Sequence, residues 1–218
     1  MTAPLGIFGG TFDPVHYGHL RTAFELLSVL RLQEMRFVPA GDPPHRDTPL
    51  AAAELRLEFV REATGDQPGF VVDARELRRQ GPSYSVLTLT EMRAEHPRTP
   101  LCLCIGMDAF LGLPQWHRWQ EIIGLAHIVV AHRPGWQVPS NGPLAELLAT
   151  RATASSDDLQ ATLAGRIYVH AVTQLEISSS GLRELLAAGH DPRYLVPDPV
   201  CARIRETGCY LSSQVPTR

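Results

Sequence analysis

Short apolar runs recur along the chain, and their length and composition indicate buried β-strands. Such runs carry few polar positions, as strands covered on both faces of a parallel sheet do. The expected strands are residues 5–8, 35–39, 70–73, 101–105, 127–131 and 166–172.

Between these strands lie segments whose apolar residues recur at helical spacing. The expected helices are residues 20–30, 51–64, 86–95 and 119–125, then a helix that starts at Ser178-Ser179-Ser180, and a last helix over 199–206. Gly208 follows the last helix, in the position where glycine commonly ends one. The alternation of strand and helix predicts an α/β fold, with one doubly wound, mostly parallel sheet of the Rossmann-like kind and C-terminal helices.

Residues 137–165 break this regularity. The interval is rich in Ala, Thr and Ser, and Pro139, Gly142 and Pro143 interrupt it. We expect helical pieces joined by loops there, with no catalytic residue. Because no stretch has the composition of a linker, we expect one domain over residues 1–218.

Composition narrows the class of partners. Of the 218 residues, 44% are hydrophobic, which is enough for the core of one sizeable domain. The net charge of −3 lacks the basic excess of proteins that bind nucleic acid, so we expect small-molecule partners and no nucleic acid. No basic segment precedes an early apolar run, and no stretch reaches the roughly 18 apolar residues of a membrane span. We therefore expect a cytoplasmic protein that does not enter membranes.

The four cysteines are Cys102, Cys104, Cys201 and Cys209, and no two of them have the C-x-x-C spacing. Cys102 and Cys104 alternate within an apolar run. We expect all four to be reduced and structural, without a zinc or redox role.

Segments with unusual chemistry follow the expected strands. In a doubly wound sheet, ligands bind beyond the carboxyl ends of the strands, where the strand order reverses. The segments in question are residues 9–19, 41–46, 106–108 and 133–135.

The first of these segments, residues 9–19, reads Gly-Gly-Thr-Phe-Asp-Pro-Val-His-Tyr-Gly-His. Paired glycines at a strand end let the backbone approach a ligand closely, and the helix that follows has free N–H groups that favour phosphate. His16 and His19, three residues apart, would share one face of the first turn of that helix. Two imidazoles beside a helix N-terminus form a set of donors for a polyphosphate. The arrangement favours phosphoryl or nucleotidyl transfer.

Other glycine-rich nucleotide loops differ from this string. No Lys-Ser or Lys-Thr follows it, as in a P-loop, and Gly6, Gly9 and Gly10 do not give G-x-G-x-x-G. The string resembles the H-x-G-H signature of the nucleotidyltransferase superfamily, and its Gly-Gly-Thr-Phe-Asp-Pro lead-in resembles that of the bacterial nicotinate mononucleotide adenylyltransferases. The tail is similar to that of the same family, in Tyr194-Leu195-Val196-Pro197 and in Gly208-Cys209-Tyr210.

The resemblance implies an ATP site. Residues 177–183 read Ile-Ser-Ser-Ser-Gly-Leu-Arg and resemble the family's I-S-S-[ST]-x-x-R motif, which grips the phosphates of ATP. Taken alone, this string would be a serine-capped helix with a solvated arginine. The residues implied to bind ATP are Gly9, Gly10, Thr11, Phe12, His16, His19, Gly106, Asp108, Ser178, Ser179, Ser180 and Arg183. Of these, the resemblance implies catalytic roles for His16, His19 and Arg183.

The resemblance also implies a site for nicotinate mononucleotide. Ser83-Tyr84-Ser85 stands where the family has S-Y-T, and free N–H groups of Tyr84 and Ser85 at a helix start could bind a carboxylate, with Ser83 as the N-cap. Trp116 is implied to stack on the pyridine ring, although a Trp at a helix start is more often part of the core. The residues implied to bind this nucleotide are Arg46, Ser83, Tyr84, Ser85, Asp108, Trp116 and Arg133, and Arg46 stands where many relatives have lysine.

The implied reaction joins two nucleotides. The 5′-phosphate of nicotinate mononucleotide would attack the α-phosphorus of ATP in line, releasing pyrophosphate and giving deamido-NAD. A protonated His16 or His19 would stabilise the charge that builds in the transition state. Mg²⁺ would arrive on the phosphates of ATP, because no cluster of carboxylates in the sequence suggests a metal site in the protein itself.

Other functions remain open from the sequence. A related adenylyltransferase could use nicotinamide mononucleotide or phosphopantetheine as its acceptor, and a regulator could bind nucleotide without turnover. A flavodoxin-like electron carrier would share the sheet. The expected partners are ATP and nicotinate mononucleotide, and the sequence leaves the oligomeric state open, with a homodimer as one option.

Overall fold

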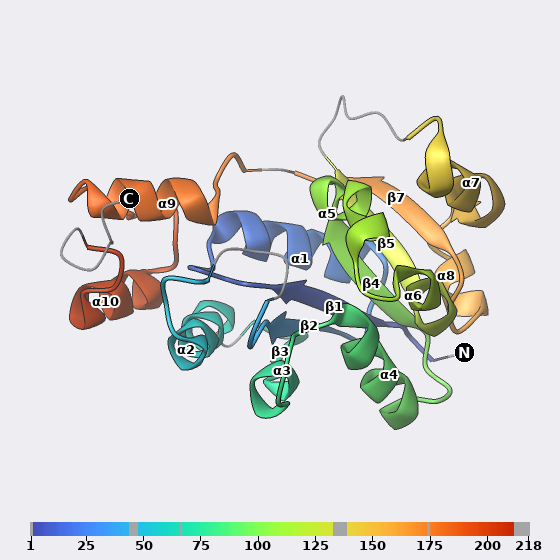
Figure 1. The fold of residues 1–218 in the computed structure, drawn as a ribbon, viewed down its shortest axis with the longest axis horizontal. Helices are drawn as coiled ribbons and strands as arrows, with labels where there is room; N and C mark the ends of the chain where they lie inside the picture. Colours follow the sequence, from blue (N-terminus) through green and yellow to red (C-terminus); the bar gives the residue numbers. More distant parts are fainter. Residues whose placement is uncertain (1, 44–47, 66, 133–138, 174, 212–218) are drawn as a thin grey trace.

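The fold is a seven-stranded parallel sheet with helices on both faces, as a computed structural model shows (Figure 1). The structure describes residues 2–43, 48–65, 67–132, 139–173 and 175–211. The strands are β1 (Leu5–Gly10), β2 (Glu34–Pro39), β3 (Phe70–Val72), β4 (Leu101–Gly106), β5 (His127–His132), β6 (Ala152–Thr153) and β7 (Ile167–Ala171). Their order in the sheet is β3-β2-β1-β4-β5-β7-β6, and every neighbouring pair is parallel.

Helices connect the strands. They are α1 (Tyr17–Val29), α2 (Ala53–Thr64), α3 (Arg75–Arg78), α4 (Ser85–Glu95), α5 (Met107–Leu111), the 3-10 helix η1 (Leu113–Gln115), α6 (Trp119–Leu125), α7 (Gly142–Arg151), α8 (Asp158–Ala161), α9 (Ser179–Ala187) and α10 (Asp198–Thr207). In the part of the chain that the structure describes, no helix is both long and apolar enough to cross a membrane.

The predicted α/β class and parallel sheet are confirmed, with two differences in the elements. The first helix begins at Tyr17 rather than at residue 20, because His16 is its extended N-cap. The short elements α3, α5, η1 and β6 were not expected. The interval from 139 to 165 holds the expected helical pieces, α7 and α8, and the two-residue strand β6 lies between them.

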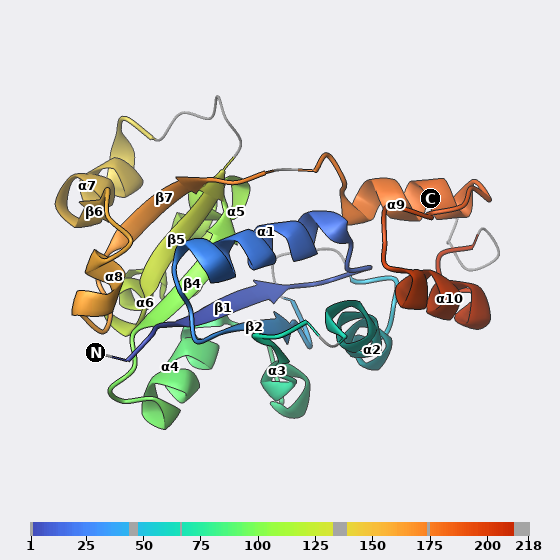
Figure 2. The ribbon, with the colours of Figure 1, turned by 180° about the vertical axis from the view of Figure 1, so that it is seen from behind.

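Alternate residues along the strands supply two hydrophobic clusters, one on each face of the sheet. Phe8, Cys102 and Cys104 belong to the cluster that α1, α2, α9 and α10 cover, and Leu103 belongs to the cluster under α4, α5 and α6. Figure 2 shows α1 lying on the opposite side of the sheet from α3 and α4. The four cysteines are buried free thiols, as expected, and burial raises the pKa of Cys104 to about 12.

The strand order reverses between β1 and β4, where the chain leaves one half of the sheet for the other. These two strands pair only from Leu5 to Ile7 and from Leu101 to Leu103, although both continue for three more residues. Strands that separate toward their carboxyl ends open a crevice at the switch point. The helices α9 and α10 lie together at the end of the sheet toward which β1 points (Figures 1 and 2).

Candidate active site

The loop after β1 leaves the sheet at this switch point. Gly9 and Gly10 are the last residues of β1, and Phe12 adopts a left-handed conformation with φ of 53°. The Phe12 ring is buried against Phe37 and against the edge of the His19 ring, whose centroid lies 5.2 Å away. A Cβ on Gly10 would lie 2.9 Å from the Phe12 ring, so glycine is needed there for the loop to turn back over the sheet.

The two histidines lie together at the start of α1. His16 is the N-cap and His19 is in the first turn, and their rings stack with centroids 3.7 Å apart. The His16 backbone N–H donates to Nδ1 of His19 at 3.3 Å. The sequence therefore placed these side chains correctly relative to each other, although His16 precedes the helix instead of belonging to it.

His16 is buried, and one of its ring nitrogens makes no hydrogen bond to the described residues. Its side chain is 5% exposed, and its Nδ1 atom has no hydrogen-bond partner among the residues that the structure describes. Burial lowers the pKa of His16 from 6.5 to about 4. The His16 ring is therefore neutral at pH 7 in the free protein, so any protonated form expected in the transition state would have to arise after a ligand binds.

Gly18, which lies between the two histidines, packs closely against the His16 ring. A Cβ on this residue would lie 2.9 Å from Nδ1 and 3.0 Å from Cε1 of His16. The His16 ring thus occupies the space where a side chain would start, and this packing accounts for the glycine between the two histidines.

The serine-rich segment at the start of α9 contacts the histidine loop directly, although more than 160 residues separate them in the sequence. The Ser179 hydroxyl donates to the carbonyl of Pro14 at 2.9 Å, and Nη1 of Arg183 donates to the carbonyl of Asp13 at 2.8 Å. The Ser178 hydroxyl accepts the Gly181 N–H at 3.1 Å and caps the helix, as predicted. Because this cap uses the Gly181 N–H, the N–H groups of Ser179 and Ser180 are the ones at the start of α9 that an anion could accept from.

The Asp13 carboxylate joins two further parts of the chain, residues 50–51 and Tyr210, to this loop. This buried carboxylate accepts hydrogen bonds from the backbone N–H groups of Leu50 and Ala51, at 2.9 and 3.0 Å, and from the Tyr210 hydroxyl at 2.7 Å. Burial raises the pKa of Tyr210, and the neighbouring Asp13 carboxylate raises it further, so the hydroxyl keeps its proton and remains a donor.

Arg56, which is 1% exposed, also binds the backbone of this loop. Its guanidinium donates to the carbonyls of Thr11, Gly41 and Ala51, at 2.7, 3.1 and 3.2 Å. Burial lowers the pKa of Arg56, and the Asp13 carboxylate offsets part of that shift. Neither Arg56 nor the role of Asp13 could be predicted from the sequence, because Arg56 binds Thr11 and Asp13 binds Tyr210, and both partners lie far away in the sequence.

The carboxyl end of β4 supplies a second set of candidates. Gly106 ends the strand beside open space, and Asp108 is exposed in the first turn of α5. Trp116 follows η1 and is half-buried, packed against the core cluster of this face together with Trp119. The structure thus gives Trp116 a core contact and leaves part of its ring exposed.

The start of α4 differs from the prediction in two ways. Tyr84, not Ser83, is the N-cap, and the Tyr84 N–H donates to the carbonyl of Pro82 at 3.0 Å. The Ser83 hydroxyl accepts the N–H groups of Gly41 and Asp42, at 2.9 and 3.1 Å. Serine here ties two loops together instead of capping the helix, so the first helical N–H group open to a carboxylate is that of Ser85.

An aromatic pair that the sequence did not indicate lies beside this helix start. The Tyr84 and His117 rings stack with centroids 4.3 Å apart. Two of the expected nucleotide-binding residues, Arg46 and Arg133, lie outside the described residues. Among the residues that the structure does describe, no three His, Cys, Asp or Glu side chains form a group that could hold a metal ion.

Comparison with known proteins places the chain in a family. A family model described as cytidylyltransferase-like matches residues 7–185. A probable nicotinate-nucleotide adenylyltransferase of Aeromonas hydrophila is 50% identical over 207 residues, covering 95% of this chain and 97% of its own. Another, from Halorhodospira halophila, is 47% identical over 206 residues and covers 94% of both chains. The chain belongs to the cytidylyltransferase-like nicotinate-nucleotide adenylyltransferases.

Solved structures share the fold of this adenylyltransferase family member. The Plasmodium falciparum nicotinic acid mononucleotide adenylyltransferase, described as complexed with NaAD, superposes with a TM-score of 0.72 and 14% identity, over 96% of this chain and 98% of its own. The same protein described as complexed with APC gives a TM-score of 0.70. At this identity the likeness concerns the arrangement of sheet and helices.

The family match covers the described residues of the candidate site, but it does not cover Tyr210, which contacts the histidine loop. Residues 7–185 include the histidine loop, the start of α4 and the Ser178–Arg183 segment. Tyr210 lies beyond that range, although it contacts Asp13 within the loop. The Aeromonas relative matches along nearly the whole chain, so its similarity extends past the family model.

Proposed function

We propose that this enzyme transfers the adenylyl group of ATP to nicotinate mononucleotide, giving deamido-NAD and pyrophosphate in NAD biosynthesis. The observation that carries the proposal is the contact of Ser179 and Arg183 with the loop that ends in His16, at the switch point of the sheet. This contact brings together two imidazoles, a guanidinium and two helix N-termini, which are the groups that a triphosphate needs. The relatives' names supply the chemistry to test.

The triphosphate of ATP would lie between α1 and α9. The backbone of Gly9, Gly10, Thr11 and Phe12 would line its path, and His16 and His19 would donate to oxygens of the reacting phosphate. Ser178, Ser179 and Ser180 would offer the N–H groups of the α9 start, and Arg183 would use donors beyond the one that binds Asp13. Gly106 would let the nucleoside approach β4, where Asp108 would bind ribose hydroxyls.

His16 would act first as a neutral donor. Its pKa of about 4 in the free protein leaves an N–H on one ring nitrogen and a lone pair on the other. A polyphosphate placed beside the ring would raise that pKa, because an adjacent negative charge favours the protonated form. Holding both reactants in line would supply much of the rate enhancement, since positioning can remove roughly 7–11 kcal/mol of a barrier.

The acceptor would bind between the starts of α4 and α6. Its carboxylate would accept from the Ser85 N–H at the start of α4, beside Ser83 and Tyr84. Its pyridine ring would lie on the exposed part of Trp116. Asp108 would also contact the ribose of this nucleotide, and Arg46 and Arg133 would meet its phosphate. A nicotinamide group would present an NH₂ donor where these N–H groups need an acceptor.

A divalent metal would reach this site as part of the ATP substrate, and we propose Mg²⁺. The ion would be bound by phosphate oxygens, as is usual for Mg²⁺ on nucleotides. We also propose that the enzyme works in the cytoplasm, which its four buried free thiols support. A homodimer is the assembly that we would test first.

Pyrophosphate release by the purified protein tests this function. The assay contains ATP and Mg²⁺ with nicotinate mononucleotide, nicotinamide mononucleotide or phosphopantetheine at equal concentration. We expect strong preference for the nicotinate nucleotide and formation of deamido-NAD. Equal use of both pyridine nucleotides would make the enzyme bifunctional, and release with phosphopantetheine alone would assign another acceptor. No release with any of the three would favour a regulator that binds nucleotide without turnover.

A further inference from the structure

Two loops leave the sheet next to each other, at the carboxyl ends of β1 and β2. The strands pair in parallel register up to Gly10 and Pro39, and the Ala40 N–H donates to the carbonyl of Gly10 at 2.9 Å. The register ends there. The histidine loop continues from β1, and residues 41–42 begin the loop that follows β2. Pairing in the sheet therefore does not fix how these two loops lie relative to each other.

One buried side chain bridges the two loops just beyond the last pair of the register. Nη1 of Arg56 donates to the carbonyl of Thr11 at 2.7 Å, and Nη2 donates to the carbonyl of Gly41 at 3.1 Å. Nε of the same side chain donates to the carbonyl of Ala51 at 3.2 Å. A guanidinium is planar and holds its donors in fixed directions, and hydrogen bonds from a charged donor are stronger than neutral ones. Arg56 therefore sets the separation between Thr11 and Gly41.

Gly41 is also held on its other sides. Its N–H donates to Oγ of Ser83 at 2.9 Å, and the Asp42 N–H donates to the same oxygen at 3.1 Å. A Cβ on Gly41 would lie 2.6 Å from the carbonyl oxygen of Glu76, so this part of the loop packs tightly against α3. Residues 41–42 are therefore fixed to α3 and to the segment that leads into α4.

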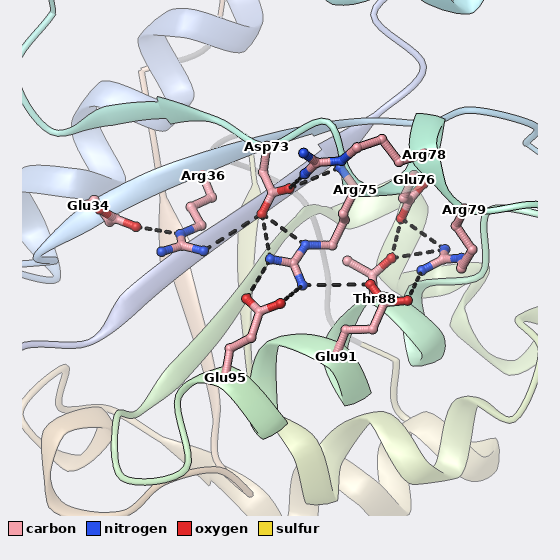
Figure 3. A network of polar contacts seen from close by, with 10 residues as sticks. All are labelled: Glu34, Arg36, Asp73, Arg75, Glu76, Arg78, Arg79, Thr88, Glu91 and Glu95. Atoms are coloured by element: carbon pink, nitrogen blue, oxygen red, sulfur yellow. Dashed lines mark hydrogen bonds and ion pairs between the residues drawn. The ribbon is translucent and has the colours of Figure 1, made fainter.

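The helices α3 and α4 are themselves joined by a network of polar side chains (Figure 3). The Thr88 hydroxyl of α4 donates to Oε1 of Glu76 in α3 at 2.5 Å. Arg79, which ends α3, donates to the Glu91 carboxylate of α4 at 2.9 Å. The two helices thus form one support, and this support includes both the residues that hold Gly41 and the start of α4.

We propose that Arg56 is a positioning residue that fixes the ATP side of the site relative to the acceptor side, by holding Thr11 and Gly41 in one guanidinium fork. This inference rests on the proposed function, in which the histidine loop binds ATP while the start of α4 and Arg46 bind the acceptor. Arg46 follows residues 41–42 in the same segment. In-line attack depends on the distance and direction between the two reacting groups. Arg56 therefore acts on the reaction of the bound pair and not on the binding of either nucleotide alone.

The test is Arg56→Lys, which keeps the positive charge and removes the planar fork. A single ammonium group cannot hold three carbonyls in the directions that the fork gives them. We expect kcat for pyrophosphate release to fall about 100-fold, the scale of a displacement near 1 Å between reacting groups. KM for ATP and KM for nicotinate mononucleotide should each stay within about threefold, because each nucleotide keeps its own binding groups.

Ser83→Ala breaks the same connection at its other end, because it removes the oxygen that accepts the N–H groups of residues 41–42. We expect kcat to fall about tenfold with both KM values within about threefold. In the double variant kcat should be about as low as in Arg56→Lys, because one break already frees the loop. A double variant whose loss is the product of the two single losses would show that the residues act independently, and this would overturn the inference.

The matched control is Arg93→Lys. Arg93 is half-buried and also donates to carbonyls of three segments, those of Thr99, Leu125 and Leu163, at 2.8 Å each. These carbonyls precede β4, β5 and β7, at the end of the sheet opposite the histidine loop. We expect a lower melting temperature with unchanged kcat and KM. The same result in Arg56→Lys would mean that Arg56 has only a structural role, and it would overturn the inference.

Calorimetric titration with each nucleotide alone provides a readout that does not need turnover. Arg56→Lys should bind ATP and nicotinate mononucleotide within about threefold of the unaltered enzyme. A large loss of affinity for either nucleotide with kcat unchanged would contradict a role in relative placement, while pyrophosphate release by the unaltered enzyme would still support the proposed function. If Arg56→Lys does not fold, kcat and KM of Ser83→Ala decide by the same criteria. If the unaltered enzyme releases no pyrophosphate with nicotinate mononucleotide, both proposals are wrong.

Discussion

Gly18 has no room for a side chain, because the His16 imidazole lies where a Cβ would be. We therefore expect Gly18→Ala to change the catalytic rate much more than the free energy of unfolding. Alanine is a better helix former than glycine by about 1 kcal/mol, so the free energy of unfolding should change by no more than about that amount. The His16 ring must move, and a displacement near 1 Å can cost about 100-fold in rate. Urea unfolding and steady-state kinetics on the same preparation measure the two effects.

Gly124→Ala is the control for that substitution. Gly124 lies in α6, and a Cβ there would meet nothing within 4 Å. We expect unchanged kinetics and a stability gain of up to about 1 kcal/mol. A Gly18→Ala enzyme with kinetics as normal as those of Gly124→Ala would show that the position of the His16 ring does not matter.

The buried neutral state of His16 predicts how stability depends on pH. Its pKa is about 4 in the folded protein and near 6.5 when exposed, so the unfolded chain binds more protons between these values. Stability is therefore complete above pH 6.5 and falls as the pH drops toward 4, by up to about 3 kcal/mol. Urea unfolding at pH 7.5 and pH 4.5 should show a smaller loss in His16→Gln than in the unaltered protein. Equal losses in both would contradict this assignment, and exposed His190 offers the control substitution.

At the scale of elements, α9 is held to the histidine loop by side chains of its first turns. Ser179→Ala removes the hydrogen bond to Pro14, and KM for ATP should rise about tenfold because Arg183 and the helix N-terminus lose their fixed place. Ser178→Ala removes the cap instead, and it should lower the free energy of unfolding by about 1 kcal/mol. Kinetics and denaturant titration distinguish the two serines. Identical profiles for both variants would mean that the Pro14 contact has no role of its own.

Elements with a strong pattern could be predicted from the sequence. The long apolar runs gave the strands that surround the site, and helical spacing gave α2, α4 and α6 nearly to their ends. The helices α3 and α5 have four and five residues, too few to display a helical period. The strand β6 has two residues and exists only because it pairs with β7, which no local pattern can indicate.

The site residues also fall into those that a local sequence pattern reveals and those that it does not. His16, His19, Ser179 and Arg183 form a local signal in two short strings, and the structure brings those strings together. Ser83 is different, because its hydroxyl binds residues 42 and 41 positions away and not its own helix. A capping pattern in the sequence cannot show that competing partner, and for this reason the predicted N-cap was wrong.

At the scale of the whole molecule, the chain's last described segment supports its first loop. Tyr210→Phe removes the hydroxyl that donates to Asp13 and leaves the shape of the ring unchanged. We expect the free energy of unfolding to fall by about 1–3 kcal/mol, the cost of a buried acceptor that loses a donor. Activity should fall as well, because Asp13 also carries the carbonyl that binds Arg183.

Tyr168→Phe is the matched control for this prediction. The Tyr168 hydroxyl lies 3.4 Å from Nδ1 of His170, away from the histidine loop. We expect a stability change within about 0.5 kcal/mol and normal kinetics. If Tyr210→Phe behaves like Tyr168→Phe in both measurements, the tail does not support the loop.

The bond between Tyr210 and Asp13 also sets the order in which a newly made chain completes its site. Every residue assigned to either nucleotide has been added by the time synthesis reaches Arg183. The Asp13 carboxylate is still without its hydroxyl donor then, because 197 positions separate the two partners. A nascent chain consequently contains all its binding residues for some time before the Tyr210 hydroxyl can bind Asp13 and stabilise the histidine loop. We therefore expect the loop to reach its full stability only after residue 210 has emerged and the Tyr210 hydroxyl has bound Asp13.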